Sequence, residues 1–247
     1  MQNKEYPEAF KNHRKPYPKL FSSFVEYGKF CNRKVIDIGC GIGRYTSLFA
    51  DQRCALLCGL DKSLDMLKKA KEKDLSGHYI LGDAESLPFK NSSFDTAVMS
   101  QVIQWVYDKK LALSEIHRIL KRKGVFLLNT LSHEQLSNLV LMKHFPEIYQ
   151  IETERFPNID ALIELLNNTN FKISTIKEIQ EFRKYDISQL VNFAADKATS
   201  ALRLYAKDVG EDNFKTKIEE YNETLKATFL NNPIFEDHNY TLIVCIK

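Results

Sequence analysis

The chain has 247 residues, of which 44% are hydrophobic and 27% charged, with a formal net charge of +3. This length can bury a substantial core, and the mild positive charge does not by itself predict nucleic-acid binding. Because no apolar run reaches the roughly 20 residues of a membrane span and the first residues are charged, neither a membrane protein nor a signal peptide is expected. The cysteines show no C-x-x-C spacing, which favours reduced thiols in the cytoplasm over a disulfide framework or a metal site. They are Cys31, Cys40, Cys54, Cys58 and Cys245.

The first 30 residues contain prolines followed by Leu20, Phe21, Phe24 and Val25, which have the spacing of a short amphipathic helix. We expect residues 1–30 to pack across the opening of the glycine-rich turn that follows. A plain covering helix and a functional lid are both compatible with this pattern.

From Lys34 onward, short apolar segments alternate with helical ones. Because such strands form parallel sheets that are covered on both faces, the pattern predicts a doubly wound α/β fold. Ser63 is a predicted helix N-cap, with Asp65 in the first turn. We expect strands at 34–38, 54–60, 78–82, 94–99 and, after a turn at Lys121–Gly124, 125–130, with helices at 43–51, 64–73 and 108–121.

After residue 130 the alternation changes. A helix at 159–168, a strand near 171–182 and a last strand at 241–247 complete a sheet of seven mostly parallel strands. Two insertions, 132–157 and 183–238, are rich in helical patterns. The second insertion predicts two amphipathic helices, one from Ile187 to Tyr205 and one from Phe214 to Phe229. We expect residues 1–247 to form a single domain with a core at 35–130.

The stretch from Lys34 to Thr46 reads K-V-I-D-I-G-C-G-I-G-R-Y-T, a buried strand, a glycine turn and the start of a helix. In this arrangement the backbone approaches a ligand closely. The dinucleotide fingerprint G-x-G-x-x-G is incomplete, because its last position falls on Arg44 when counted from Gly39 and on Thr46 when counted from Gly41. The alternative ligand is a nucleoside without phosphate.

Acidic residues follow the next two strands. Asp61 ends the second strand, where its carboxylate can accept two hydrogen bonds from ribose hydroxyls, and this suits either ligand. Asp83 ends the third strand and can accept from the amine of adenine, while the Ala84 backbone binds a ring nitrogen. Two acids beside a turn without phosphate-binding features favour S-adenosylmethionine, whose sulfonium is cationic.

Five segments in order carry a family resemblance: V-I-D-I-G-C-G-I-G-R, G-L-D-K-S-L-D-M-L, G-D-A-E-S-L-P-F-K-N-S-S-F-D, S-Q-V-I-Q-W-V-Y-D and L-K-R-K-G-V-F-L-L. They resemble the ordered motifs of class I S-adenosylmethionine-dependent methyltransferases of the broad type 11 group. That group includes malonyl-carrier-protein and trans-aconitate methyltransferases. The resemblance covers residues 35–130 well and the rest loosely, and it implies a Rossmann-like methyltransferase fold with helical lid insertions that form the acceptor pocket.

The resemblance also implies which residues hold the cofactor. Asp37, Gly39, Cys40 and Gly41 are expected to line the methionine tail, with Cys40 as a small residue facing the cofactor. Asp61 is expected to bind the ribose, Lys62 and Met66 to flank the adenine, and Asp83 and Ala84 to read its edge. The remaining expected contacts are Ser100, Gln101 and Gln104 near the sulfonium, and Arg14 and Tyr17 at the cofactor's carboxylate.

Methyl transfer from a sulfonium is an in-line displacement, in which the protein supplies alignment and, for some acceptors, a base. His133 follows strand five and is the candidate base, with surface exposure as the alternative. Trp105 and Tyr107 are candidates for the wall of the acceptor pocket.

We expect a small-molecule acceptor. A tRNA or protein acceptor is the alternative, although N-P-P-Y is absent after strand four and the basic clusters Lys68–Lys73 and Lys121–Lys123 are short. A third possibility is a non-catalytic cofactor-binding protein. No cluster for an anionic substrate is evident, so neither the carrier-protein nor the aconitate activity is assigned.

Overall fold

A computed structural model describes residues 15–74, 77–230 and 232–247. The chain divides into two compact units. What we call the sheet unit contains the described residues of 16–132, 156–179 and 240–247, and the helical unit contains Lys15 and the described residues of 133–155 and 180–239. The two predicted insertions, 132–157 and 183–238, therefore fall almost entirely in the helical unit.

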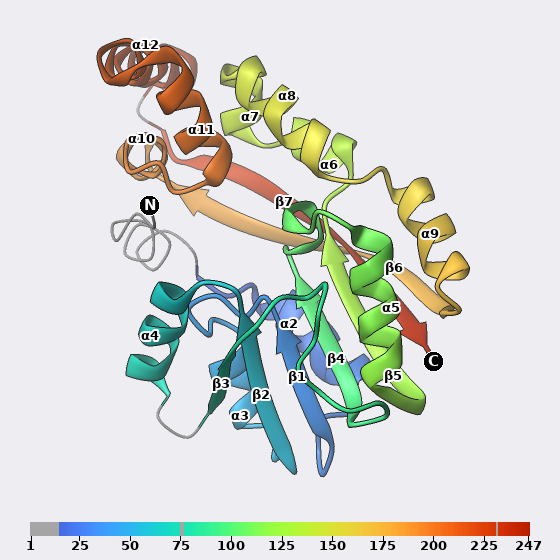
Figure 1. Ribbon diagram of the computed structural model, residues 1–247. Coiled ribbons are helices and arrows are strands. Elements are labelled where there is room, and N and C mark those ends of the chain that lie inside the picture. The colour runs from blue at the N-terminus through green and yellow to red at the C-terminus, as the bar shows by residue number, and fades with distance from the viewer. Residues whose placement is uncertain (1–14, 75–76, 231) are drawn as a thin grey trace. The chain divides into compact units, whose positions relative to one another are not determined.

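The sheet has seven strands in the order β3-β2-β1-β4-β5-β7-β6, with parallel pairing from β1 to β5 and β7 antiparallel to β5 (Figure 1). This confirms the predicted seven-stranded, mostly parallel sheet. The strands are β1 (Lys34–Ile38), β2 (Leu56–Asp61), β3 (His78–Leu81), β4 (Phe94–Ser100), β5 (Leu120–Thr130), β6 (Lys172–Tyr185) and β7 (Ile234–Ile246).

Two strands begin earlier than the sequence predicts. β5 starts at Leu120, which pairs with Phe94, and the predicted turn at 121–124 is an irregularity inside the strand before Thr96 pairs with Val125. β7 starts at Ile234 instead of residue 241. Its first half alternates buried and exposed side chains and contains polar residues, so it lacks the continuous apolar run by which the end of the strand was recognised.

One face of the sheet is covered by α5 (Lys109–Ile119) and α9 (Ile159–Asn168), as the periodicity predicted (Figure 1). Their apolar stripes, including Leu113 and Leu162, are fully buried in the main core cluster. Asp108 caps α5 by accepting the N–H of Leu111 at 2.9 Å.

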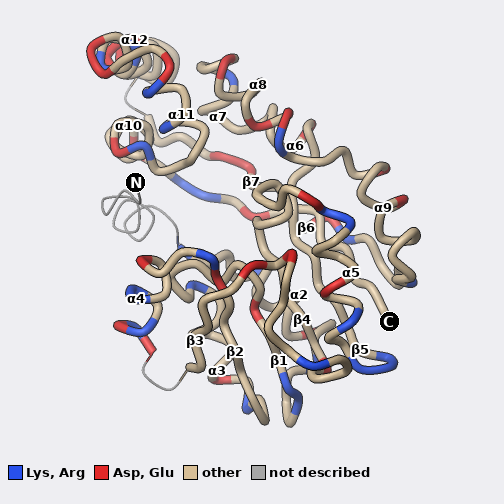
Figure 2. Tube along the Cα trace, in the orientation of Figure 1, with Lys and Arg blue, Asp and Glu red and all other residues tan. Residues whose placement is uncertain are grey.

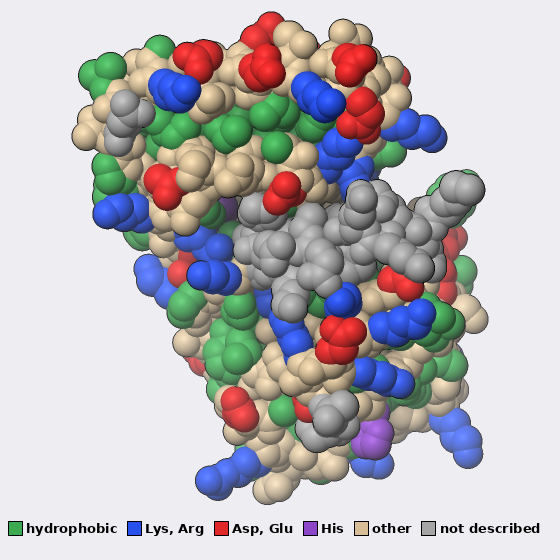
Figure 3. Space-filling model, turned by 90° about the vertical axis from the view of Figure 1, so that its left-hand side faces the viewer, with side chains coloured by type: hydrophobic (Ala, Val, Ile, Leu, Met, Phe, Trp, Pro, Cys, Tyr) green, Lys and Arg blue, Asp and Glu red, His purple; other side chains and the backbone are tan. Residues whose placement is uncertain are grey.

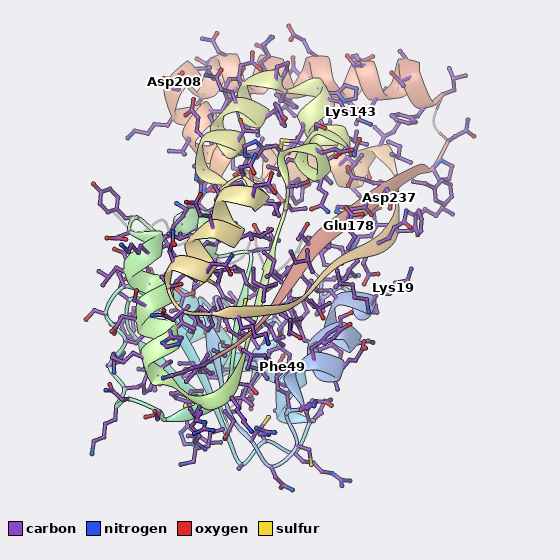
Figure 4. The ribbon with its side chains drawn as sticks, turned by 90° about the vertical axis from the view of Figure 1, so that its right-hand side faces the viewer. Lys19, Phe49, Lys143, Glu178, Asp208 and Asp237 are labelled. Atoms are coloured by element: carbon purple, nitrogen blue, oxygen red, sulfur yellow. The ribbon has the colours of Figure 1, made fainter. Side chains whose placement is uncertain are left out.

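The other face of the sheet is covered by α2 (Pro18–Gly28) and α3 (Thr46–Ala50). Their aromatic side chains form a buried cluster, in which the ring of Phe49 lies 4.6 Å from that of Phe30 and 6.0 Å from that of Phe24 (Figure 4). The helix predicted at 20–25 is confirmed. α3 is shorter than the predicted 43–51, because Gly43 has φ +69° and the turn continues to Tyr45.

The remaining elements of the sheet unit are α4 (Leu64–Lys73) and a 3₁₀ turn, η1 (Ile103–Trp105). Ser63 caps α4 by accepting the N–H of Met66 at 3.3 Å, which confirms the predicted N-cap. No helix in the described parts of the chain has the length and apolarity that a membrane span requires.

The helical unit differs from the prediction of two helices at 183–238, because three are present. The first predicted helix is interrupted at 196–199, where Lys197 has φ +50° and Thr199 caps a new helix by accepting the N–H of Leu202 at 3.2 Å. Lys143 and Asp208 lie on helices of this unit (Figure 4). Its helices are α6 (His133–Ser137), α7 (Val140–His144), α8 (Pro146–Arg155), α10 (Ile187–Ala195), α11 (Ser200–Val209) and α12 (Glu211–Phe229).

We predict that Phe49→Ala lowers the free energy of unfolding by about 3–5 kcal/mol, because it empties the centre of the aromatic cluster. Leu111→Ala on α5 is the matched control, since its side chain is 45% exposed, and it should change stability by less than about 1 kcal/mol. Urea unfolding measures both. A loss below about 1 kcal/mol for Phe49→Ala would contradict the role of this cluster.

Candidate functional site

The three glycines that follow β1 at every second position differ in the space around them. All have positive φ: +71° at Gly39, +56° at Gly41 and +69° at Gly43. A Cβ on Gly39 would collide with Val102, and one on Gly43 would lie 2.9 Å from the Tyr79 hydroxyl oxygen. A Cβ on Gly41 would meet no atom of the described residues within 4 Å. Packing therefore requires glycine at 39 and 43, whereas at 41 no described atom restricts a side chain and only the positive φ favours glycine.

The end of β2 holds this turn in place. The carboxylate of Asp61 accepts the N–H of Gly41 through Oδ2 and the N–H of Ser63 through Oδ1, both at 2.8 Å. The backbone N–H of Gly39 donates to the carbonyl of Leu60 at 2.7 Å. Burial raises the pKa of Asp61, and these backbone donors oppose the shift. Because each carboxylate oxygen has two lone pairs, Asp61 retains capacity for a ligand's hydroxyl groups.

Asp37 is a second carboxylate at the same turn. Its side chain is buried, and Oδ2 accepts the hydroxyl of Thr46 at 2.6 Å. The pKa of Asp37 is raised to about 6, mainly by burial and also by the neighbouring Asp61 carboxylate, while the Thr46 hydrogen bond opposes the shift. Two carboxylates at one turn favour a ligand that carries positive charge.

The residues expected at the adenine lie around β2, β3 and α4. Met66 is buried in the first turn of α4, and Lys62 is exposed at the end of β2. Asp83 is exposed beyond β3, where Oδ1 accepts the N–H of Glu85 at 3.0 Å, and Ala84 is buried beside it. Their contact with an adenine ring stays a prediction.

The ends of β4 and β5 carry a polar cluster. Gln101 has φ +58°, its N–H donates to the carbonyl of Asn129 at 2.9 Å, and Nε2 of Gln104 donates to the carbonyl of Gln101 at 3.0 Å. Nδ2 of Asn129 donates to the Ser100 hydroxyl at 3.0 Å. Four buried polar atoms here have no hydrogen-bond partner within the described part of the chain: Gln101 Nε2, Gln104 Oε1, Asn129 Oδ1 and Thr130 Oγ1.

Asn129 and Thr130 are fully buried polar residues of this cluster, and the sequence did not single them out as site residues. The available signal was their place at the end of β5, where N-T directly follows the apolar run V-F-L-L. Buried polar atoms without partners are uncommon in native structures, and they point to a ligand or to water.

The thiol of Cys40 belongs to a small apolar cluster with Leu67, Ala70 and Tyr79. Burial raises its pKa well above the usual value of a thiol, which disfavours the reactive thiolate. The expected contact of Cys40 with a cofactor stays a prediction.

Of the two site residues expected in the N-terminal segment, the structure describes Tyr17 but not Arg14. Tyr17 is buried, its N–H donates to the hydroxyl of Tyr45 at 3.3 Å, and its ring lies 5.9 Å from the Arg44 guanidinium carbon. The structure therefore brings Tyr17 beside the two residues that follow the glycine turn. Arg14 lies outside the described residues.

The catalytic candidate His133 is the first residue of α6 in the helical unit, and its carbonyl accepts the hydroxyl of Tyr149 at 3.4 Å. Its proposed role as a base stays a prediction. In the sheet unit, Trp105 is 39% exposed and Tyr107 is 96% exposed, so neither belongs to the core.

Comparison with known protein families gives one match, over residues 36–128, to the model described as "Methyltransferase domain". The matched stretch contains the glycine turn, Asp61, Asp83 and the end of β4. Together with the seven-stranded sheet, the match shows that this part of the chain is similar to a methyltransferase domain.

Curated relatives with the name Malonyl-[acyl-carrier protein] O-methyltransferase match part of the chain. The protein of Hamiltonella defensa is 41% identical over 105 residues, which is 42% of this chain and 40% of the relative. That of Salmonella typhimurium is 37% identical over 105 residues, 42% of this chain and 41% of the relative. The chain thus spans less than half the length of these relatives in the matched region.

Solved structures match most of the chain. The YcgJ protein of Bacillus subtilis has a TM-score of 0.65 at 19% identity, covering 92% of this chain and 97% of that one. The [4+2]-cyclase SpnF has a TM-score of 0.61 at 20% identity, covering 92% and 80%. These likenesses concern the fold, and the cyclase shows that the fold alone does not define the reaction.

The described residues fit S-adenosylmethionine. No described atom lies within 4 Å of a Cβ position at Gly41, and the carboxylates of Asp37 and Asp61 match a ligand with cationic groups and ribose hydroxyls. The unpartnered polar atoms at the ends of β4 and β5 add donors and acceptors at the same edge of the sheet.

We predict that Asp37→Asn stabilises the ligand-free protein in a pH-dependent way. The amide keeps an oxygen for the Thr46 hydrogen bond and removes the buried charge. Since the folded pKa of about 6 lies above the 3.8 of an unperturbed aspartate, wild-type stability falls as the pH rises from about 4 to about 6 and then stays lower. The variant should gain on the order of 1–3 kcal/mol at about pH 8 and nothing at about pH 4.

Urea unfolding at the two pH values measures this difference. A stability difference that is independent of pH would show that Asp37 does not titrate as its burial implies.

Proposed function

We propose that this chain transfers the methyl group of S-adenosylmethionine to a small-molecule acceptor. The observation that supports this best is the Asp61 carboxylate, which joins the Gly41 turn to the end of β2 and leaves lone pairs for ribose hydroxyls. The match of residues 36–128 to a methyltransferase domain supports the same conclusion.

In this proposal each residue has a binding or orienting task. Asp61 accepts hydrogen bonds from the ribose, Asp37 faces the α-ammonium group, and the side chains near Met66 and Ala84 contact the adenine. The cofactor, when bound, supplies a methyl group activated by the sulfonium. Ser100, Gln101 and Gln104 border the methyl, and the buried surroundings exclude water from an in-line displacement.

A thioester-linked acceptor on a carrier protein is the second candidate, because the curated relatives are named for that substrate. Their match covers 42% of this chain, so most of the chain has no counterpart in it. We therefore place the free small molecule first.

A tRNA acceptor has less support, because the basic clusters named above are partly neutralised. Lys68 pairs with Asp65 at 3.6 Å, Lys69 with Glu72 at 3.3 Å and Lys121 with Asp95 at 2.8 Å. Acidic and basic residues both occur along the traces of α4 and α12 (Figure 2). They are also interspersed on the face shown in Figure 3, instead of forming a patch of one sign.

His133 remains our proposed general base for an acceptor that must lose a proton. A cytoplasmic location is part of the same proposal, supported by five cysteines that are all free thiols.

Calorimetry with S-adenosylhomocysteine tests the cofactor assignment. We expect binding to the wild type and a loss of at least about tenfold in affinity for Asp61→Ala, because the ribose contact and the turn are both disturbed. Asp65→Ala removes the same charge four residues later and should change affinity less than about twofold. If the wild type does not bind, or if both variants behave alike, the site assignment fails.

Labelled cofactor tests the acceptor. We expect the labelled methyl group to enter the small-molecule fraction of a cell extract, and His133→Asn to slow transfer without changing affinity for S-adenosylhomocysteine. Label in an acyl carrier protein would support the second candidate, and label in RNA the third. No transfer to any fraction would favour a non-catalytic cofactor-binding protein.

A further inference from the structure

Two amide side chains of the sheet unit have oxygen atoms without a hydrogen-bond partner in the described part of the chain: Gln104 in η1 and Asn129 at the end of β5. Asn129 is fully buried, and its Nδ2 donates to the hydroxyl of Ser100 at 3.0 Å. Nε2 of Gln104 donates to the carbonyl of Gln101 at 3.0 Å. Since a carbonyl oxygen only accepts hydrogen bonds, this contact fixes the Gln104 amide with its nitrogen toward Gln101.

Strand register places Asn129 on the face of the sheet that carries the first carboxylate of the glycine turn. Ser100 lies two residues beyond the β4 partner of Asp37, and its own partner in β5 is Asn129. Because side chains alternate along a strand, all three lie on the same face. The segment after β4 also packs against the turn itself, since a Cβ on Gly39 would lie 2.4 Å from the side chain of Val102.

The backbone between these side chains has an unusual conformation. Gln101 has φ +58°, and its N–H donates to the carbonyl of Asn129 at 2.9 Å. Residues other than glycine with a positive φ are uncommon, and such strained residues cluster at active sites and ligand sites. The Gln101 backbone thus connects Asn129, through its N–H, with the Gln104 amide, through its carbonyl.

The free atoms of the two amides determine which chemical group suits them. An amide oxygen only accepts hydrogen bonds, so its partner is an N–H or O–H donor. A carboxylate has only acceptor oxygens and would leave Gln104 Oε1 and Asn129 Oδ1 unpaired. A hydroxyl or an amine carries the hydrogen that these oxygens require.

We propose that Gln104 and Asn129 bind the reacting group of the methyl acceptor, and that this group is a hydroxyl or an amine instead of a carboxylate. This inference rests on the proposed function and narrows its substrate class. By accepting the hydrogen, the amide oxygens orient the acceptor atom, whose lone pair forms the new bond to the methyl carbon. The carbon–sulfur bond breaks with its electron pair left on sulfur, and one proton leaves the acceptor for the general base or for water.

The chemical stability of the transferred methyl group tests the substrate class. The full chain is incubated with S-adenosylmethionine labelled in the methyl group and with the small-molecule fraction of a cell extract. Mild alkali releases a methyl ester as volatile methanol, whereas methyl ethers and N-methyl amines are stable. We expect the label to stay non-volatile, and cation exchange then separates a retained amine from an ether.

Two variants test the assigned residues. Asn129→Leu and Gln104→Met keep the approximate size of the side chains and remove the amides. Each should raise the amount of the small-molecule fraction needed for half-maximal transfer by roughly 5- to 100-fold, which corresponds to leaving one buried donor unpaired. Calorimetry should show that the affinity for S-adenosylhomocysteine changes by less than about twofold.

Thr96→Val is the matched control, because Thr96 of β4 is also fully buried and its hydroxyl donates to the carbonyl of Gly28 at 2.9 Å. This variant should lower the midpoint of thermal unfolding and leave transfer unchanged. Asn129→Leu should do the reverse. The midpoint of its ligand-free form should be equal to or above that of the wild type, since the substitution removes a buried oxygen that has no partner in the described residues.

Volatile label after alkali, unchanged transfer by Asn129→Leu, or a midpoint of that variant well below the wild type's would overturn this inference and leave the proposed function intact. If the wild type binds S-adenosylhomocysteine but labels nothing in the small-molecule fraction, the proposed function itself fails, and this inference fails with it.

Discussion

The Asp61 carboxylate accepts two backbone N–H groups, one from the glycine turn and one from the residue that caps α4. These two hydrogen bonds connect the end of β2 to the turn after β1 and to the first residues of α4. Because strands β1 and β2 are parallel neighbours, their carboxyl ends meet at one edge of the sheet, and a single side chain can join them. The geometry of the proposed cofactor site depends on this connection.

The same edge of the sheet contains groups that do not favour the folded state without a ligand. Asp37 is buried with a raised pKa, and four buried polar atoms at the ends of β4 and β5 lack partners within the described residues. An unsatisfied buried polar group costs roughly 1–3 kcal/mol. Such groups are retained at functional sites, where a ligand or an ordered water completes their hydrogen bonds.

In the proposed function, the methyl donor and the acceptor are recognised by different parts of the chain. The methyltransferase-domain match lies within 36–128, and the glycine turn, Asp61 and Asp83 are all inside it. The helices of 133–155 and 187–229 lie outside it and belong to the helical unit. The fold is also similar to that of a [4+2]-cyclase, so a sheet of this kind supports more than one reaction and does not by itself specify the substrate.

Periodicity alone predicted much of the sheet unit. Buried parallel strands are continuous apolar runs, so β1 to β4 were recognised within about two residues at each end, and Ser63 and Asp108 lie at the helix starts that their side chains cap. The break between α10 and α11 was missed, because the apolar spacing continues through it while Lys197 adopts a left-handed conformation. Propensity and spacing carry little information about a single backbone angle.

The sequence by itself determined the order of chemical groups along the chain: a glycine turn, then Asp61, then Asp83, each after an apolar strand. It could not determine which side chains turn toward the ligand. Only the tertiary structure placed the Cys40 thiol in the cluster around Tyr79, left no described atom within 4 Å of a Cβ position at Gly41, and put the Arg44 guanidinium over the rings of Tyr45 and Tyr17. The physical reason is that side-chain direction depends on contacts between residues far apart in the chain, whereas strand and turn formation depend mainly on neighbours.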